Sequence, residues 1–432
     1  YFILFEKRLS NKMISPIIHS IEEIKFPKPE LITLHNQIQL YGFNGSKNDI
    51  LRIDLVFDSG KWTEPAPHIA EAVAKLFKSG TSKLSSFEIN EQIDFYGTTL
   101  KCSAGYNTFT ISVYCMHRFL EPSLQLLQTC LTEIIFPEHE IELMQKNAIS
   151  KLKVNLEKND FIASAEFKKL LFGNAHPYGY AYNEANIKNI TQKLLVQFYT
   201  QDIHPSNCTV FIAGKYGEKE LELINQYIGK WSTKNEYKKQ DLIFTSTLTN
   251  QKKHPIKKEK SVQASIIIGK EFIHKKHHDY AAFTLLNTLF GAYFGSRLMS
   301  NIREEKGLTY GIYSSLSTLK NTGILAIQTD TNLENLELCL QEIYFEMQRL
   351  QDESIPEQEI TLARNYLLGK YLGRTDGVFN QIDVFKSYFV EGIDINKFEE
   401  FVSIIKQTNA VTLQQLAQQY LQKESMVEVV VG

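Results

Sequence analysis

His68 and Glu71, three residues apart, are the first side chains in this sequence with types and spacing that suit metal chemistry. A zinc site on one helix needs two imidazoles four residues apart on the same face, with a glutamate that polarises the bound water. Ala72 stands where the second imidazole of a site at His68 would be, and Pro67 precedes His68. We therefore expect His68 to stand at a helix start. A displaced zinc site at His68 and Glu71 stays open as an alternative.

A second group of histidines, His274, His277 and His278, lies beside Asp279 in a lysine-rich segment. Imidazoles and carboxylates can hold a metal ion. This spacing resembles no catalytic arrangement, however, and a metal captured here would be adventitious. We expect solvated side chains in a loop before a helix.

The balance of charges excludes a global attraction to nucleic acid or to an anionic membrane. The chain has 47 basic and 49 acidic residues and a formal net charge of -2, so partners must be recognised locally. The richest basic stretch has no interleaved aromatic residue and is expected to be a solvated linker; its lysines are Lys252, Lys253, Lys257, Lys258 and Lys260. No apolar run approaches the roughly 18 residues of a membrane helix. We expect neither nucleic acid nor a membrane as a partner.

The five cysteines favour a reducing compartment. Their number is odd and no two of them form a C-x-x-C pair, which argues against a disulfide framework and against a cysteine metal site. We expect each to be a small buried residue, and we expect the cytoplasm rather than the periplasm as the location. The opening residues 1–5 are too short for a signal-peptide core. Residues 1–23 are expected to form an N-terminal extension.

The chain is long enough for two domains of roughly 200 residues each, and its halves repeat one plan. Three segments of the first half recur in the second: Asn107-Thr108 as Asn321-Thr322, Pro137-Glu138 as Pro356-Glu357, and the apolar strand 209–214 as 427–432. The offsets are 214, 219 and 218 residues. Such constant offsets indicate one fold duplicated with small insertions.

Each half has the same predicted order of elements: a strand, an amphipathic helix, a second helix, a pair of strands, and longer helices. The first four elements are 51–57, 68–78, 87–95 and 109–113 in the first half, and 264–268, 280–289, 297–305 and 323–327 in the second. This order predicts an α+β fold of two homologous domains, each a mostly antiparallel sheet layered with helices. The polar segment 232–260 is predicted to link domains 24–231 and 261–432.

Two neighbouring segments carry a long motif. Residues 290–298 read Phe-Gly-Ala-Tyr-Phe-Gly-Ser-Arg-Leu, and residues 301–310 read Asn-Ile-Arg-Glu-Glu-Lys-Gly-Leu-Thr-Tyr. They are similar to the signature G-x-x-x-S-R-L…R-E-x-K-G-x-x-Y of the pitrilysin, insulinase and mitochondrial processing peptidase family, the inverzincin zinc metallopeptidases. The resemblance covers about residues 24–432. Further agreements are Ser79-Gly80-Thr81, Phe172-Gly173 and His176-Pro177-Tyr178-Gly179.

The family resemblance also shows what this chain lacks. Active members carry His-x-x-Glu-His on a helix just before the Gly-Thr step, here Gly80-Thr81. The residues at the corresponding positions are Glu71, Ala74 and Lys75 for His, Glu and His, and Leu152, with Glu157 nearby, for the third ligand on a later helix. An alanine cannot take a proton, and an ammonium offers no lone pair to a metal. The resemblance therefore implies a degenerate zinc motif and no cofactor in this chain.

The family's substrate-holding pair is retained as Arg303 and Tyr310. Gly307 predicts a helix end between them, with Tyr310 opening the next strand, so that both side chains could point into one cavity. A tyrosine hydroxyl can donate to a scissile carbonyl oxygen as charge develops there, and a guanidinium can hold peptide carbonyls or a carboxylate. The alternative is an exposed arginine and a tyrosine with its ring in the core.

The family builds its chamber from four such domains, in one long chain or in two half-size chains. The resemblance therefore implies a non-catalytic subunit that pairs with a zinc-bearing homologue, encloses unfolded peptides and supplies Arg303 and Tyr310 to the partner's site. Peptides would add as a strand to a sheet edge, which we place near residues 100–104. The alternatives are a structural scaffold subunit and an active zinc metallopeptidase with a non-standard site. The chain could also form a homodimer.

Overall fold

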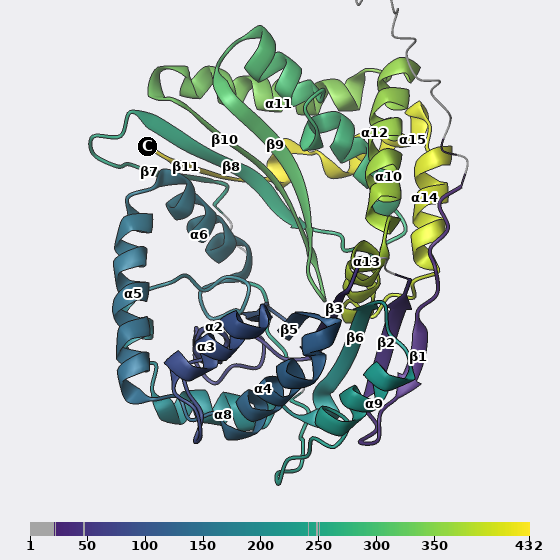
Figure 1. The fold of residues 1–432 in the computed structure, drawn as a ribbon. Coiled ribbons are helices and arrows are strands. Elements are labelled where there is room, and N and C mark those ends of the chain that lie inside the picture. Colours follow the sequence, from purple (N-terminus) through teal and green to yellow (C-terminus); the bar gives the residue numbers. More distant parts are fainter. Residues whose placement is uncertain (1–20, 22, 46–47, 241, 248, 250) are drawn as a thin grey trace, which may run out of the picture.

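The computed structural model describes residues 21, 23–45, 48–240, 242–247, 249 and 251–432. It contains two sheets, one in each half of the molecule, with helices layered on them (Figure 1). The predicted α+β class, with two mostly antiparallel sheets, is confirmed. The predicted N-terminal extension lies outside the described residues except for Ile21 and Glu23.

The first sheet has six strands in the order β1-β2-β6-β3-β5-β4, and only β2 and β6 pair in parallel. The strands are β1 (Glu30–Thr33), β2 (Gln39–Asn44), β3 (Ile50–Phe57), β4 (Thr99–Ala104), β5 (Phe109–Met116) and β6 (Cys208–Gly214). Burial alternates along β5, because successive side chains of a strand point to opposite faces. β4 lies at the edge of the sheet, where the sequence placed residues 100–104.

Helices cover this sheet and connect its strands. They are α2 (Ile69–Leu76), α3 (Ser86–Tyr96), α4 (Leu120–Glu133), α5 (Glu138–Leu156), α6 (Asn159–Phe172), α7 (Glu184–Lys188), α8 (Gln192–Asp202) and α9 (Glu218–Tyr227), with 3-10 turns η1 (His117–Phe119) and η2 (Pro205–Asn207). The bounds of α3 follow from its sequence. Ser85 and Glu88 form a capping box at its start, and Gly97 ends it with a positive φ of 57°.

The second sheet has five strands in the order β7-β11-β8-β10-β9, with β7 and β11 parallel. The strands are β7 (Lys253–Ile256), β8 (Gln263–Phe272), β9 (Thr309–Thr318), β10 (Gly323–Asn332) and β11 (Val427–Val431). β7 falls inside the segment 232–260 that the sequence presented as a linker. This segment forms a strand because it pairs with the edge of β11. The local sequence cannot reveal that pairing, since β11 lies far along the chain.

The helices of the second half are α10 (Tyr280–Asn287), α11 (Leu336–Asp352), α12 (Glu357–Thr375), α13 (Val378–Val390), α14 (Lys397–Gln407) and α15 (Ala410–Tyr420), with short 3-10 turns η5 (Leu333–Asn335) and η6 (Lys423–Ser425). Two further turns are π-helical, η3 (Thr288–Ala292) and η4 (Met299–Glu305). The predicted helix 280–289 therefore continues as a π turn, and the predicted helix 297–305 begins at Arg297, as predicted, and widens into a π turn from Met299. π turns are rare and frequently lie at functional sites.

Each half contributes one helix to the other half's sheet. α6 packs its Phe167 and Leu171 into one core with Ile267 of β8 and Val429 of β11. In return, α13 of the second half packs against β2 and β6, where Phe385 lies 5.0 Å from the ring of Tyr41. The two helices begin at residues 159 and 378, an offset of 219 residues, so the exchange follows the duplication. Because α6 and α13 each pack on the sheet of the other half, the domain ranges 24–231 and 261–432 remain a proposal.

Two further properties bear on the environment of the chain. Among the described residues, no helix combines the length and apolar character that crossing a bilayer would require. Cys115, Cys130, Cys208 and Cys339 are buried, as expected, whereas Cys102 is half-buried.

Candidate functional site

The start of α2 is the part of the fold at which the family pattern has its first zinc ligand. His68 is the N-cap residue of this helix, as the sequence predicted, and its φ of 74° is one that L-residues rarely adopt. The Glu64 carboxylate holds this turn, because it accepts hydrogen bonds from the backbone N–H of His68 at 3.2 Å and of Ala70 at 2.9 Å. The hydroxyl of Tyr180 donates a further bond to Glu64. Burial raises the pKa of Glu64 to about 7, although these donors act to lower it.

Glu71, at the position of the first imidazole, already has a cationic partner. The ammonium of Lys61 lies 2.6 Å from its Oε1. Its Oε2 lies 3.8 Å from His68 Nδ1, too far for a hydrogen bond. Burial opposes the charged form of this carboxylate, but His68 and the Lys61 ammonium outweigh burial and hold the pKa of Glu71 below its ordinary value.

The remaining positions of the degenerate motif do not fit zinc. Ala74 is half-buried and carries no ligand atom, and Lys75 is exposed with a cationic head. Leu152 is a buried apolar residue of α5. Glu157 ends α5, and its carboxylate lies 3.8 Å from Lys258 Nζ. A zinc ion needs three or four N, O or S donors that converge on one point, and these residues offer no such set.

The alternative site at His68 and Glu71 does not fit zinc either. The imidazole of His68 is 2 % exposed and stacks on Tyr182 at 3.9 Å, with Tyr180 edge-on at 5.1 Å. Neither ring nitrogen has a hydrogen-bond partner within the described part of the chain. No third metal-binding side chain converges with these two among the described residues. A catalytic zinc also needs an open position for water, which this packing denies.

The described residues contain one group of three side chains that could hold a metal, His277, His278 and Asp279. The hydrogen bonds of this group build a turn. The Nδ1 atoms of His274 and His277 accept backbone N–H groups two residues later, at 3.0 and 3.2 Å. Metal binding at Nε2 would require a proton on Nδ1 and would break those bonds. The arrangement agrees with the expectation of a loop before α10.

Arg303 and Tyr310 lie next to each other on the second half. Arg303 lies in η4, whose end is followed by Gly307 with a positive φ of 62°, and Tyr310 is the second residue of β9. The guanidinium carbon of Arg303 is 5.8 Å from the centre of the Tyr310 ring and 4.6 Å from that of Phe294. Tyr310 is 94 % exposed, so its ring is not part of the core. The predicted helix end and strand start between them are confirmed.

Phe294 is a member of this cluster that sequence reasoning did not single out. Its ring is exposed, and it lies under the face of the Arg303 guanidinium. Such cation–π contacts contribute about 0.5–1 kcal/mol at exposed sites. Phe294 does lie inside the 290–298 motif, so the motif was the available signal. Its contact with Arg303 was not visible from spacing.

Comparison with known proteins finds a family match over part of the chain. Residues 189–367 match the family model described as "Peptidase M16 inactive domain". Among curated relatives, the "Uncharacterized zinc protease YmxG" of Bacillus subtilis is 22% identical over 354 residues, which is 81% of this chain and 83% of the relative. The "Non-peptidase homolog YmxG" of Helicobacter pylori is 20% identical over 333 residues, 76% of each chain.

Solved structures show the same fold. A peptidase M16 inactive domain from Pseudomonas fluorescens superimposes with a TM-score of 0.83 at 20% identity, covering 94% of this chain and 98% of that one. A protease from Helicobacter pylori superimposes with a TM-score of 0.82 at 18% identity, covering 94% and 100%. The chain is therefore similar to M16, or pitrilysin-type, peptidase homologues, some of them described as inactive, and the resemblance seen in its sequence is confirmed.

Proposed function

We propose that this chain is the non-catalytic subunit of a two-chain pitrilysin-type peptidase. It pairs with a zinc-bearing homologue, helps to enclose an unfolded peptide, and presents Arg303 and Tyr310 to the partner's zinc site. Activity requires the pair. We further propose the cytoplasm as the place of action, from the odd number of cysteines without a C-x-x-C pair.

The observation that carries this proposal is the placement of Arg303 and Tyr310. A tyrosine that served only the fold would bury its ring, yet Tyr310 is 94 % exposed beside a guanidinium at 5.8 Å. The phenol can donate a hydrogen bond to the carbonyl oxygen of a scissile peptide as negative charge develops there. The guanidinium, with its five donors, can hold carbonyls or a terminal carboxylate.

The neighbouring surface suits an extended peptide. β4 lies at one edge of the first sheet and β9 at one edge of the second, and an edge offers backbone N–H and C=O groups to an added strand. A cavity of about 510 Å³ lies between α6 and the second sheet, with Phe161 and Asp160 on one side and Tyr313 and Gln328 on the other. Backbone pairing at an edge would give broad tolerance of peptide sequence.

The test begins with the complex. The chain is co-expressed with a homologue of similar size that carries an intact His-x-x-Glu-His, and light scattering measures whether the two form a heterodimer or this chain a homodimer. Hydrolysis of an unfolded peptide with a fluorescent reporter is then compared for the pair and for each chain alone. We expect turnover only from the pair. Activity of this chain alone with bound zinc would refute the proposal.

The role of the two residues is tested in the same complex. Removing a single donor to a developing oxyanion lowers kcat by about 10²–10³-fold, so Tyr310→Phe should reduce kcat with little change in KM. Arg303→Ala should mainly raise KM, and Arg303→Lys should restore only part of the loss, because an ammonium lacks the planar fork of donors. Tyr366→Phe is the control, since Tyr366 is an exposed tyrosine of α12 that does not line the peptide cavity. Unchanged turnover in Tyr310→Phe would remove this residue from the mechanism.

A further inference from the structure

The ammonium of Lys61 lies beside a carboxylate in a mostly buried position. The loop between β3 and α2 carries it, and its Nζ is 2.6 Å from Glu71 Oε1. The side chains of Lys61 and Glu71 are only 14% and 20% exposed, which is unusual for a lysine. Charge pairs of this kind are screened by solvent much less than surface pairs.

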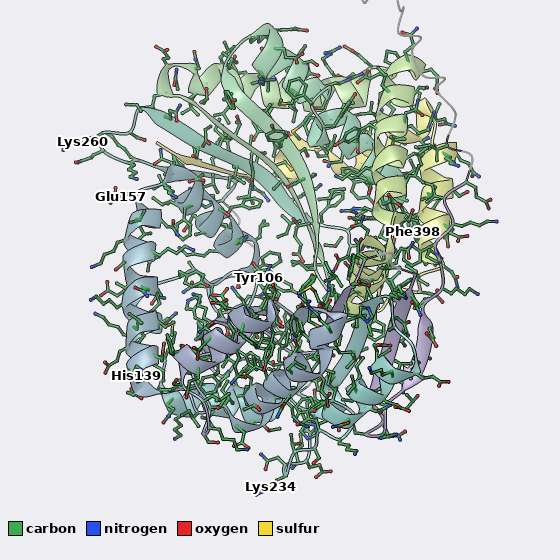
Figure 2. The ribbon with its side chains drawn as sticks, viewed as in Figure 1. Tyr106, His139, Glu157, Lys234, Lys260 and Phe398 are labelled. Carbon is green, nitrogen blue, oxygen red and sulfur yellow. The ribbon has the colours of Figure 1, made fainter. Side chains whose placement is uncertain are left out.

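Three tyrosine rings surround the same ammonium. The Nζ of Lys61 is 5.5 Å from the ring centre of Tyr106, 5.6 Å from that of Tyr180 and 5.6 Å from that of Tyr182. These rings come from the turn between β4 and β5 and from the segment after α6. Figure 2 places Tyr106 on the side of the first half that faces the second. A cation within about 6 Å of aromatic ring centres is attracted to their faces, and proteins use cages of such rings to recognise quaternary ammonium ligands.

The cage is fixed by the fold and not by the lysine alone. The backbone N–H of Lys61 donates to Gly105 at 3.1 Å and that of Trp62 donates to Tyr106 at 2.8 Å, which sets the distance between Lys61 and the Tyr106 ring. His68 stacks on Tyr182, which holds that ring in place. The walls of the site therefore have supports that do not depend on the ammonium.

The carboxylate of this site stands at the first zinc-ligand position of the family pattern. We propose that residues Glu71, Tyr106, Tyr180 and Tyr182 form an intramolecular binding site for a primary ammonium, and that Lys61 is a tethered cation that replaces the metal as the charge partner of α2. The ammonium attaches α2 to the segment after α6 without a metal. It also occupies the carboxylate and repels a divalent ion. This inference does not rest on the proposed subunit role.

Chemical rescue tests the proposal. Lys61→Ala removes three methylenes and the ammonium, which propylammonium can replace. Breaking a partly buried ion pair should lower Tm by about 3 °C or more, and propylammonium should restore a substantial part of that shift. 1-Propanol, of nearly the same shape without charge, should restore none. In Lys61→Ala with Glu71→Gln, propylammonium should have no specific effect. Equal restoration by the amine and the alcohol, or an unchanged Tm in Lys61→Ala, would overturn the proposal.

A second set of measurements keeps the test decisive if Lys61→Ala does not fold. Lys61→Met keeps the stem, and Glu71→Gln keeps the shape of the carboxylate. If the two groups form one site, the double variant should lose less in Tm than the sum of the two single variants. Full additivity would refute the site. Zinc should not raise the Tm of the unaltered protein, and a chelator should not lower it. If zinc raised the Tm and Glu71→Gln abolished that rise, the proposal that Lys61 replaces the metal would be refuted.

Discussion

The ion network between β3 and α13 gives the sharpest prediction for stability, because it joins the two halves. Arg52 donates two hydrogen bonds to Asp383, at 2.9 and 2.7 Å, and lies 2.8 Å from Asp54. Lys386 Nζ lies 2.6 Å from Asp54 and 3.3 Å from Asp383. Asp54 is fully buried, whereas the Asp383 side chain is 53% exposed. Two cations thus neutralise two carboxylates, one of them without access to water.

Arg52→Met should lower the free energy of unfolding by about 3 kcal/mol, the lower end of the cost of breaking a buried ion pair. The lower end applies because Lys386 still neutralises Asp54 after the substitution. Asp383→Asn should cost about 1 kcal/mol or less, because that carboxylate is half in water and an exposed pair contributes little. The loss of stability should therefore depend on how deeply the carboxylate is buried and not on how many hydrogen bonds Arg52 donates to it.

Urea unfolding followed by circular dichroism measures both variants, with Lys397→Met as the control for an exposed pair on α14. High salt should have little effect on the stability of the unaltered protein, because salt screens a buried ion pair only weakly. The slope of the transition shows whether the halves still unfold together. A loss below about 1 kcal/mol for Arg52→Met, or a larger loss for Asp383→Asn, would contradict this reasoning.

Three other outcomes follow from particular side chains. The pKa of Glu64 in the folded protein, about 7, lies above its ordinary value of 4.5. Between these two pH values the folded state binds a proton that the unfolded state has released, so the stability of the protein should fall as pH rises from 4.5 to 7. Glu64→Gln should flatten this part of a profile of Tm against pH. Phe398 is 1 % exposed, and its ring centre lies 5.4 Å from that of Phe26. Phe398→Ala should lower the free energy of unfolding by about 3–5 kcal/mol, measured by denaturant unfolding. Tyr310→Phe and Arg303→Ala should leave Tm almost unchanged, because Tyr310 lies on the surface; a fall of several degrees in calorimetry would assign them to the fold.

Much of the fold could be predicted because it depends on local patterns. Alternation along residues 109–113 predicted β5, and the repeated dipeptides Pro137-Glu138 and Pro356-Glu357 lie at corresponding places, the starts of α5 and α12. The repeat offsets predicted one architecture used twice. The π turns η3 and η4 and the strand β7 were not predicted, since they depend on packing and on a pairing partner far along the chain.

The sequence by itself determined that the zinc motif is degenerate. Ligand chemistry is a property of residue type at a fixed helical spacing, so Ala74 and Lys75 exclude the motif wherever the helix lies. The Arg303 and Tyr310 pair was also readable, because both belong to one contiguous motif.

Only the tertiary structure decided what replaced the motif. Lys61 and Glu71 are ten residues apart and Tyr180 is more than a hundred residues further on, and no local pattern relates them. The same holds for the exchange of α6 and α13 and for the contact of Arg52 with Asp383. Contacts between distant segments are fixed by how the two sheets and their helices pack, and packing is a property of the whole chain.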